Sequence, residues 1–339
     1  MEKIYLFTDY RGQFSSSTKH RGAAVNLKSL KQRFADQGFE LIIKPFVDVN
    51  LRSQNYKDSW VLYQSSEDPG LFYKDYIEDI LLGLQLQGAK LIPSFKYFRA
   101  HHNKNFMEIL RDMHGLEEIK NLQAWSYGTY EDFEKNAEKF DRSSFVLKAA
   151  ATSKGQGVSL LERKSDKMKI PKKISKTFSF KNLQYLFETI KTGKKHLPIS
   201  NHRRKFIVQE FVQDLKGDYR VIVYGDKYYA LYRENRKNDF RASGSMKFHQ
   251  EFSIPDGLLD YASKVSKSFN TPYMSLDIGF KKNTFFLFEF QFVSFGQYTL
   301  EKSTHHFRNL NGVWEKIVET PDLEREIANS VTGFISKNR

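Results

Sequence analysis

The sequence contains no cysteine, and this absence excludes several kinds of protein at once. Its 339 residues provide no disulfide framework, no thiolate zinc site and no cysteine nucleophile. It also lacks a run of about 18 uninterrupted apolar residues, and its first apolar run ends at Asp9 and does not continue as a signal-peptide core. We therefore expect a cytoplasmic protein with no export signal and no membrane span.

Charge of one sign is scarce in one segment. Between Arg163 and Lys205 there are fourteen Lys and Arg residues but only two acids, whereas the net charge of the whole chain is +14. Such a segment attracts polyanions, so an acidic polysaccharide, an acidic peptide, nucleic acid and anionic lipid all stay open as partners that dock through 163–205. A solvated insertion without a partner is the alternative.

The pattern of apolar residues divides the chain into three parts. Apolar residues make up 40% and aromatic residues 15%, as in folded proteins. In 1–97, short apolar runs alternate with helical periods, which predicts a Rossmann-like domain with a parallel sheet. The part 98–205 combines helices, a strand and the lysine-rich insertion. Strands joined at Gly225-Asp226 and Lys282-Asn283 predict a mainly antiparallel sheet in 206–339. The fold class is thus α/β and α+β.

Three oxygen-bearing side chains lie near the C-terminus on two predicted strands. Glu289 and Gln291 alternate with Phe288, Phe290 and Phe292, so they point to one face of their strand. If the two strands form a hairpin, Asp277 shares that face. Hard oxygen ligands of this kind suit Mg²⁺. An acid pair on a sheet surface is the alternative, but uncompensated charge in an apolar strand is costly.

A second pattern is a strand that ends in Lys148 and is followed by a loop, 153–158, that contains a serine, a lysine and two glycines. A lysine together with flexible backbone N–H groups can surround phosphate oxygens. The motif is weak in isolation, because a Gly-x-Gly loop is often only a turn.

A third pattern combines a strand end with a series of arginines. The segment 209–212 can present backbone donors and acceptors to an adenine if it is an edge segment, and Arg220, Arg233 and Arg241 carry planar donors suited to phosphates. Each arginine alone is also explained as an ordinary surface residue.

In order and spacing, these motifs resemble the ATP-grasp superfamily, and within it the ribosomal-protein glutamate ligase branch, from about Asn103 to Gly296. The resemblance implies the ATP-grasp fold, with ATP held between the central and C-terminal parts and Mg²⁺ bound by Asp277, Glu289 and Gln291. It implies catalytic roles for Arg233, Lys148 and Arg220. The residues that it assigns to the nucleotide are Lys104, Lys148, Lys154, Gly155, Gly157, Gln209, Glu210, Phe211, Val212 and Asp218, with Asp218 at the ribose.

The sequence departs from the family in three places. Gln291 stands where the family has Asn, and Phe-Val-Ser-Phe-Gly296 stands where the family has Ser/Asn-Pro-Gly. The stretch from Arg241 to Ser245 resembles a family segment that contains an Asn, which is absent here. An amide oxygen is retained at position 291, so these changes bear mainly on the side that receives the acceptor substrate.

The function implied is an ATP-dependent carboxylate–amine ligase that forms an amide through an acyl phosphate. An ATP-grasp kinase and a non-catalytic nucleotide- or polyanion-binding protein are the alternatives. For an acidic peptide, amino acid or saccharide as substrate, the candidate contacts are Arg11, Ser16, Lys19, Arg241, Ser243 and Ser245. Arg11, Ser16 and Lys19 belong to a loop expected at the carboxyl end of the first parallel strand. We expect His305 and His306 to be surface histidines.

Overall fold

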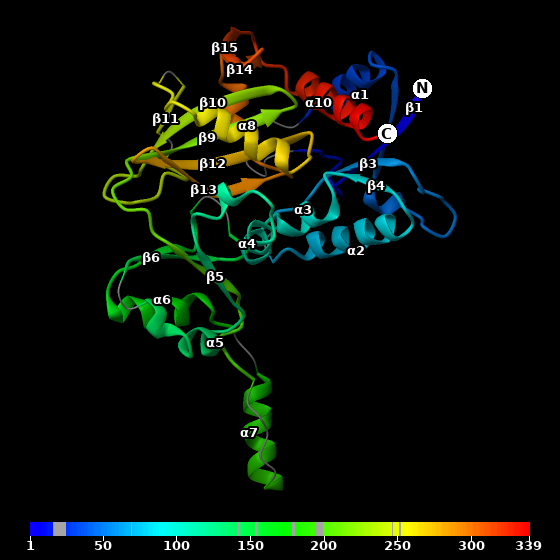
Figure 1. The fold of residues 1–339 in the computed structure, drawn as a ribbon. Coiled ribbons are helices and arrows are strands. Elements are labelled where there is room, and N and C mark those ends of the chain that lie inside the picture. Colours follow the sequence, from blue (N-terminus) through cyan, green and yellow to red (C-terminus); the bar gives the residue numbers. More distant parts are fainter. Residues whose placement is uncertain are drawn as a thin grey trace. The chain divides into compact units, whose positions relative to one another are not determined.

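The computed structural model describes residues 1–15, 25–68, 70–140, 143–152, 155–177, 180–193, 199–245, 247–250 and 252–339 (Figure 1). Two compact units make up the chain. Unit 1 joins Met1–His101 to Leu215–Arg339, and unit 2 is His102–Asp214. In the described ranges, none of the helices is both long enough and apolar enough to cross a membrane.

The first half of unit 1 is a parallel sheet with helices, as predicted. Its strands are β1 (Glu2–Thr8), β2 (Phe39–Pro45), β3 (Trp60–Tyr63) and β4 (Lys90–Ile92), in the order β2-β1-β3-β4. Its helices are α1 (Leu27–Ala35), α2 (Phe72–Leu86) and α3 (Phe95–Ala100). The helix α2 ends just before Gly88, which has a φ of 96°, a conformation that favours glycine at a helix end.

The second half of unit 1 is a seven-stranded antiparallel sheet. Its main path is β13-β12-β9-β10-β14-β15, and β11 pairs with β10. The strands are β9 (Gly217–Tyr224), β10 (Lys227–Glu234), β11 (Phe248–His249), β12 (Tyr273–Lys281), β13 (Thr284–Gln291), β14 (His305–Leu310) and β15 (Val313–Val318). The helices are α8 (Leu258–Ser268), α9 (Tyr298–Glu301) and α10 (Leu323–Lys337).

The two predicted hairpin turns are confirmed. Lys282 and Asn283 join β12 to β13 with φ values of 48° and 59°, as a two-residue turn matched to the twist of the strands requires. Gly225, at the turn between β9 and β10, has a φ of 60°.

The two halves of unit 1 share one apolar core. Ile4 and Leu6 of β1 lie in the same buried cluster as Ile222 of β9 and as Ile327 and Val331 of α10. Burial of each such side chain contributes about 1.5–3 kcal/mol. The first and last thirds of the sequence are therefore parts of one folded body.

Unit 2 contains a four-stranded sheet in the order β5-β8-β6-β7. These strands are β5 (Ala124–Tyr127), β6 (Phe145–Ala149), β7 (Val158–Leu161) and β8 (Phe206–Glu210), and the helices are α4 (Lys104–Asp112), α5 (Tyr130–Glu134), α6 (Lys164–Ile174) and α7 (Lys181–Thr192). The strand with which the third predicted part began, β8, thus lies in this sheet. The helix α5 is followed by a 3-10 turn, Ala137–Phe140.

An aromatic core covers one face of the unit 2 sheet. Phe145, Phe206 and Val208 on the strands pack with Phe133 and Phe140, which follow β5. The rings of Phe133 and Phe140 are stacked with centroids 5.5 Å apart. Because strand side chains alternate, residues Lys148 and Gln209 point to the opposite face.

Candidate active site

One face of the seven-stranded sheet carries a row of charged and amide side chains from four strands. Glu289 of β13 lies directly opposite Asp277 of β12, and Asp277 lies opposite Arg220 of β9. Gln291 lies opposite Ser275. Residues directly opposite each other point to the same face of a sheet. Asp277, Glu289 and Gln291 therefore lie on one face of the sheet, as the sequence predicts.

Ion pairs connect the centre of this row. The Arg220 guanidinium donates to Asp277 Oδ1 at 2.8 Å and to Oδ2 at 3.0 Å. Arg233 on β10 lies 2.8 Å from Asp277 Oδ2, and it donates to both oxygens of Asp218 at 2.6 and 2.7 Å. Two guanidinium groups and two carboxylates thus form one charge-balanced network, held by planar, two-pronged contacts.

This network fixes the protonation of its central groups. Burial alone would raise the pKa of the Asp277 carboxyl, but Arg220 and then Arg233 outweigh burial and hold that pKa well below its usual range. Burial would lower the pKa of Arg233, yet Asp218 and Asp277 raise it. Asp277 is therefore an anion and Arg233 a cation at neutral pH.

Along β9 this face changes from charged to apolar. Asp218 and Arg220 are followed on the same face by Ile222 and Tyr224, which belong to the core shared with α10. The charged row is therefore anchored on a rigid, packed sheet, which favours precise positioning of its side chains.

In unit 2, Lys104, Lys148 and Gln209 come together at one face of the sheet. The two lysines are predicted to contact the nucleotide, and Gln209 begins the segment 209–212 predicted to receive the adenine. Lys104 is the first residue of α4, and its Nζ donates to the carbonyl of Thr152, four residues beyond Lys148. The same helix contacts the face of β8 that carries Gln209, whose amide lies 3.4 Å from Glu108 Oε1. Lys148, opposite Ile207 on β8, points to this face as well.

Glycines shape the loop that follows Lys148. Gly155 and Gly157 have φ values of 71° and 63°, and Gly157 accepts a hydrogen bond from the backbone of Ala149 at 2.8 Å. A Cβ on Gly157 would lie 2.8 Å from the Ala149 side chain, so this position requires glycine. Lys154 lies outside the described residues.

The segment 209–212, which we considered as an edge segment that could bind adenine, lies only partly at an edge of the sheet. The strand β8 lies between β5 and β6, and the backbone N–H of Glu210 donates to Gln123 at 2.9 Å. Glu210 therefore belongs to the interior of the sheet. Phe211 and Val212 follow the strand as irregular chain.

The predicted substrate residues that can be located pair with neighbouring groups. Arg11 donates to the buried Asp9 at 2.8 and 2.9 Å, and Arg241 donates to Asp239 at 2.9 Å. The carbonyl of Ser243 accepts from Arg236 at 2.6 Å. Ser245 donates its backbone N–H to Ala242 at 3.0 Å. Ser16 and Lys19 lie outside the described residues.

The prediction of surface positions for His305 and His306 is wrong. The two histidines are 4% and 2% exposed. The ring of His306 lies 5.8 Å from that of Tyr229, and the ring of His305 lies 5.1 Å from that of Phe307.

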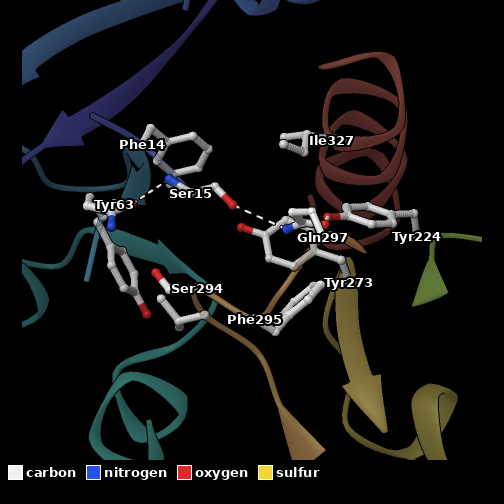
Figure 2. Close-up of a pocket in the computed structure, with 11 residues that line it drawn as sticks. Phe14, Ser15, Tyr63, Tyr224, Tyr273, Ser294, Phe295, Gln297 and Ile327 are labelled. Atoms are coloured by element: carbon white, nitrogen blue, oxygen red, sulfur yellow. Dashed lines mark hydrogen bonds between the residues drawn. The ribbon is translucent and has the colours of Figure 1, made fainter. Parts of the chain in front are cut away.

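Sequence reasoning missed a cavity in unit 1 (Figure 2). It is small, with a volume of about 20 Å³, which is room for roughly one water molecule. The residues that line it are Phe14, Ser15, Tyr63, Gln64, Tyr224, Tyr273, Val293, Ser294, Phe295, Gln297 and Ile327. Among these described residues there is no charged side chain.

Hydrogen bonds join opposite walls of the cavity. Tyr224 donates to Gln297 Oε1 at 2.8 Å, Gln297 donates to Ser15 Oγ at 3.3 Å, and the backbone of Ser15 donates to Gln64. Ser15 and Ser294 have φ values of 50° and 49°, a backbone conformation that is uncommon outside glycine and concentrates at functional sites.

Solved structures match the chain over nearly its whole length. D-cycloserine synthetase DcsG has a TM-score of 0.54 and 11% identity, with 98% of this chain and 99% of that chain covered. A RimK domain protein ATP-grasp from Sphaerobacter thermophilus has a TM-score of 0.52 and 13% identity, with coverage of 98% and 100%. The chain has the ATP-grasp fold. ATP-grasp ligase PsnB, complexed with a minimal precursor, matches at a TM-score of 0.53 and 13% identity, with coverage of 98% and 100%.

The ATP-grasp likeness is one of structure. No family model matches the chain, and no curated protein matches its sequence.

The oxygen donors of the charged row fit a divalent cation. Asp277 Oδ2 accepts from both arginines, whereas Oδ1 accepts one hydrogen bond, and a carboxylate oxygen has two lone pairs. The amide nitrogen of Gln291 donates to Glu289 Oε1 at 3.1 Å. Two carboxylates and one amide on neighbouring strands form a hard oxygen set of the kind that Mg²⁺ prefers.

The loop after β13 links the cavity to the charged row of the ATP-grasp fold. Ser294, Phe295 and Gln297 line the cavity, and a Cβ built on Gly296 between them would lie 3.8 Å from Arg220 Nη1. In the sequence, the Phe-Val-Ser-Phe-Gly296 stretch, which departs from the family pattern, was the one indication of this wall of the cavity. The sequence contained no indication of the opposite walls, because Gln64 and Tyr224 are ordinary residues at the ends of strands.

Proposed function

We propose that this protein is an ATP-dependent carboxylate–amine ligase that forms an amide and releases ADP and phosphate. The observation that carries the proposal is the charged row of unit 1, in which Asp277, Glu289 and Gln291 lie beside Arg220 and Arg233 on one sheet face. The ATP-grasp fold is the setting in which such a row is useful. Relatives by fold that are named as ligases or synthetases support this choice.

Each unit contributes a different part of this activity. In the proposal Lys104 and Lys148 of unit 2 contact the phosphates, the glycine loop covers them, and 209–212 receives the adenine. Asp277, Glu289 and Gln291 of unit 1 hold Mg²⁺, which supplies charge neutralisation for the phosphates when it is bound. One fold relative, PsnB, is named as complexed with Mg and ADP. That both sets act on one nucleotide is part of the proposal.

For Asp218 we propose a role other than the ribose contact. Both of its oxygens accept hydrogen bonds from Arg233, which fits a residue that positions the guanidinium better than one that binds a ribose. Arg233 is buried, with 4% of its side chain exposed, and Arg220 is more accessible at 20%. We assign Arg220 to direct contact with the reacting acyl phosphate and Arg233 to its support.

The chemistry proceeds in two balanced steps. A substrate carboxylate oxygen attacks the γ-phosphorus, the bond to the β–γ bridging oxygen breaks, and ADP leaves. The amine nitrogen of the acceptor then attacks the acyl carbon, phosphate leaves with the bonding electrons, and the nitrogen loses a proton. The fixed guanidinium groups stabilise negative charge that develops on phosphoryl and acyl oxygens.

The small uncharged cavity of unit 1 is the proposed site for one group of the substrate. Its hydroxyl and amide groups suit sugar hydroxyls or peptide groups, and its tyrosine and phenylalanine walls suit an apolar surface. Through Gly296 the cavity adjoins Arg220, where the reacting carboxylate of an acidic substrate would lie. PsnB is named as complexed with precursor peptide PsnA2 and AMPPNP, which favours a peptide.

The first test uses nucleotide binding, which needs no knowledge of the substrate. We expect AMPPNP to bind the chain in the presence of Mg²⁺, measured by calorimetry, and Lys148→Ala to abolish binding. Lys31→Ala changes an exposed lysine of α1 and serves as the matched control. Unchanged affinity in Lys148→Ala would contradict the assignment.

The second test separates the ligase from a kinase. A panel of acidic peptides, amino acids and uronic acids is incubated with ATP, Mg²⁺ and hydroxylamine. An acyl phosphate is converted by hydroxylamine to a hydroxamate, whereas a phosphate ester on a hydroxyl is not. A stable phosphorylated product with no hydroxamate would reject the ligase, and binding without turnover on the whole panel would favour a non-catalytic protein.

A further inference from the structure

The helix α7 in the basic segment turns apolar side chains outward. Phe187 is 68% exposed and Ile190 is 74% exposed. They are three residues apart and therefore share one side of the helix. Exposed apolar residues are ordinary when scattered, but a shared side on one helix defines a surface.

The polar side of α7 makes its attachment to unit 2. The Asn182 side chain donates to the carbonyl of Ile199 at 2.6 Å and accepts from the N–H of Ile199 at 3.0 Å. It also lies 3.2 Å from the Asn201 side chain. At about 100° per residue, Asn182 lies about 140° around the helix from Phe187 and about 80° from Ile190. The segment 199–201 that Asn182 contacts therefore leaves both apolar side chains exposed.

Positive charge lies at both ends of α7. Lys181 and Lys191, at the two ends of α7, are both exposed. Between Lys172 and Arg204 the sequence has nine basic residues and a single acid, Glu188. A partner must therefore be attractive to cations and to an apolar helix side together.

Basic residues together with an exposed apolar helix side favour one of the possible polyanionic partners over the others. Nucleic acid and acidic polysaccharide would satisfy the lysines but offer no apolar phase for Ile190. An anionic bilayer offers both, because lipid headgroups attract lysine and the acyl boundary accepts Phe and Ile. We propose that α7 binds anionic membrane surfaces as an interfacial helix. With twelve residues it is only about 18 Å long, too short to span a bilayer but long enough to lie along its surface.

Vesicle binding tests the proposal. The full chain is sedimented with vesicles of phosphatidylcholine containing a quarter phosphatidylglycerol, and with pure phosphatidylcholine. We expect binding to the anionic vesicles, and Phe187→Gln with Ile190→Gln should weaken it by about tenfold or more. Lys181→Gln with Lys191→Gln should weaken it on the order of tenfold and flatten its salt dependence.

The matched control removes equally exposed apolar residues elsewhere. Phe72 and Leu86 of α2 are 78% and 80% exposed, and Phe72→Gln with Leu86→Gln should leave vesicle binding unchanged. Far-ultraviolet circular dichroism verifies that each variant is folded. Absence of vesicle binding, or binding undiminished by the α7 variant, would overturn the proposal. The same holds if α7 instead mediates binding to heparin or self-association without vesicles.

The absence of cysteine permits a second, direct readout. Ile190→Cys creates a unique thiol that can carry an environment-sensitive fluorophore, and Leu86→Cys is the control. The label at position 190 should shift to the blue on addition of anionic vesicles, and the label at position 86 should not. Equal responses at both positions would show binding that does not use α7.

Discussion

Each unit buries a cluster of opposite charges, and the two clusters are built differently. In unit 2, Arg111 pairs with Glu108 at 2.7 Å and donates to the carbonyl of Ile119 at 2.9 Å, with both side chains at most 2% exposed. In unit 1, Asp277 pairs with two arginines on a face that continues to the half-buried Glu289. Both units thus bury an ion pair, and what distinguishes the row assigned to the proposed activity is the additional oxygen donors beside the pair, at a more accessible position.

The largest effect on the Mg²⁺-dependent part of nucleotide affinity is expected from Asp277→Asn. The change removes one anionic ligand and leaves two guanidinium groups with one fewer carboxylate, so the Mg²⁺-dependent affinity for AMPPNP should fall roughly a hundredfold or more. Calorimetry with and without Mg²⁺ measures this. The control is Asp226→Asn, which alters an exposed pair with Arg308. If Asp277→Asn keeps the full Mg²⁺ effect, the metal assignment fails.

In unit 2 the corresponding change should affect stability. Arg111→Met leaves Glu108 buried without its cation, and the free energy of unfolding should fall by about 3–5 kcal/mol. Adding Glu108→Met should recover most of this loss, because an apolar pair can replace a buried ion pair. Urea unfolding followed by fluorescence provides the values. A double variant as unstable as the single one would show that the pair does more than balance charge.

A third buried charge, Lys74 of α2, gives a pH-dependent effect. Its Nζ donates to Ser65 Oγ at 3.2 Å and to the carbonyl of Phe98 at 3.3 Å, and burial lowers its pKa to about 7. In the unfolded chain the pKa is about 10.4, so the unfolded state binds more protons between these values and stability rises with pH there.

Lys74→Met should therefore stabilise the protein most at low pH. Below pH 7 the cost of the buried cation is fully present, and the variant should gain roughly 2–4 kcal/mol at pH 6. The gain should shrink steadily as the pH rises from 7 toward 10. Thermal unfolding across this range compares the variant with the unaltered chain, and a gain independent of pH would contradict the lowered pKa.

The smallest effect is expected from Gln291→Asn, which restores the residue of the family that the sequence resembles. An amide oxygen is kept, so the Mg²⁺-dependent AMPPNP affinity should change by about threefold or less. Gln291→Leu removes the oxygen and should lower the affinity further. If Gln291→Leu has no effect on the affinity, the amide is not a metal ligand, and only the carboxylates of Asp277 and Glu289 remain as proposed ligands.

Much of the fold could be predicted from local signals. Alternating residues and turn residues gave the strands β9, β10, β12 and β13, and the period of two placed Glu289 and Gln291 on one face. The resemblance placed Lys104 and Lys148 in roles that the geometry of unit 2 accommodates but does not test. The three-part division of the chain and its cytoplasmic location likewise stay predictions.

The rest depended on long-range packing. The residues of a strand do not determine which sheet the strand joins. For this reason we grouped β8 with the C-terminal strands on sequence alone. His305 and His306 were misjudged because their burial depends on groups distant in sequence, such as Tyr229, whose ring lies 5.8 Å from that of His306. The cavity brings together Ser15, Gln64 and Gln297, and no local pattern links positions so far apart in the chain.

The strand β13 stands first in the order of its sheet, with its backbone ladder formed to β12. An outermost strand opens locally more readily than an interior one. A cation held by Asp277 on β12 and Glu289 on β13 would add a side-chain link across that seam, so ligation would slow hydrogen exchange along Thr284–Gln291. Binding of the ion would then also stabilise the outer strand of the sheet against local opening.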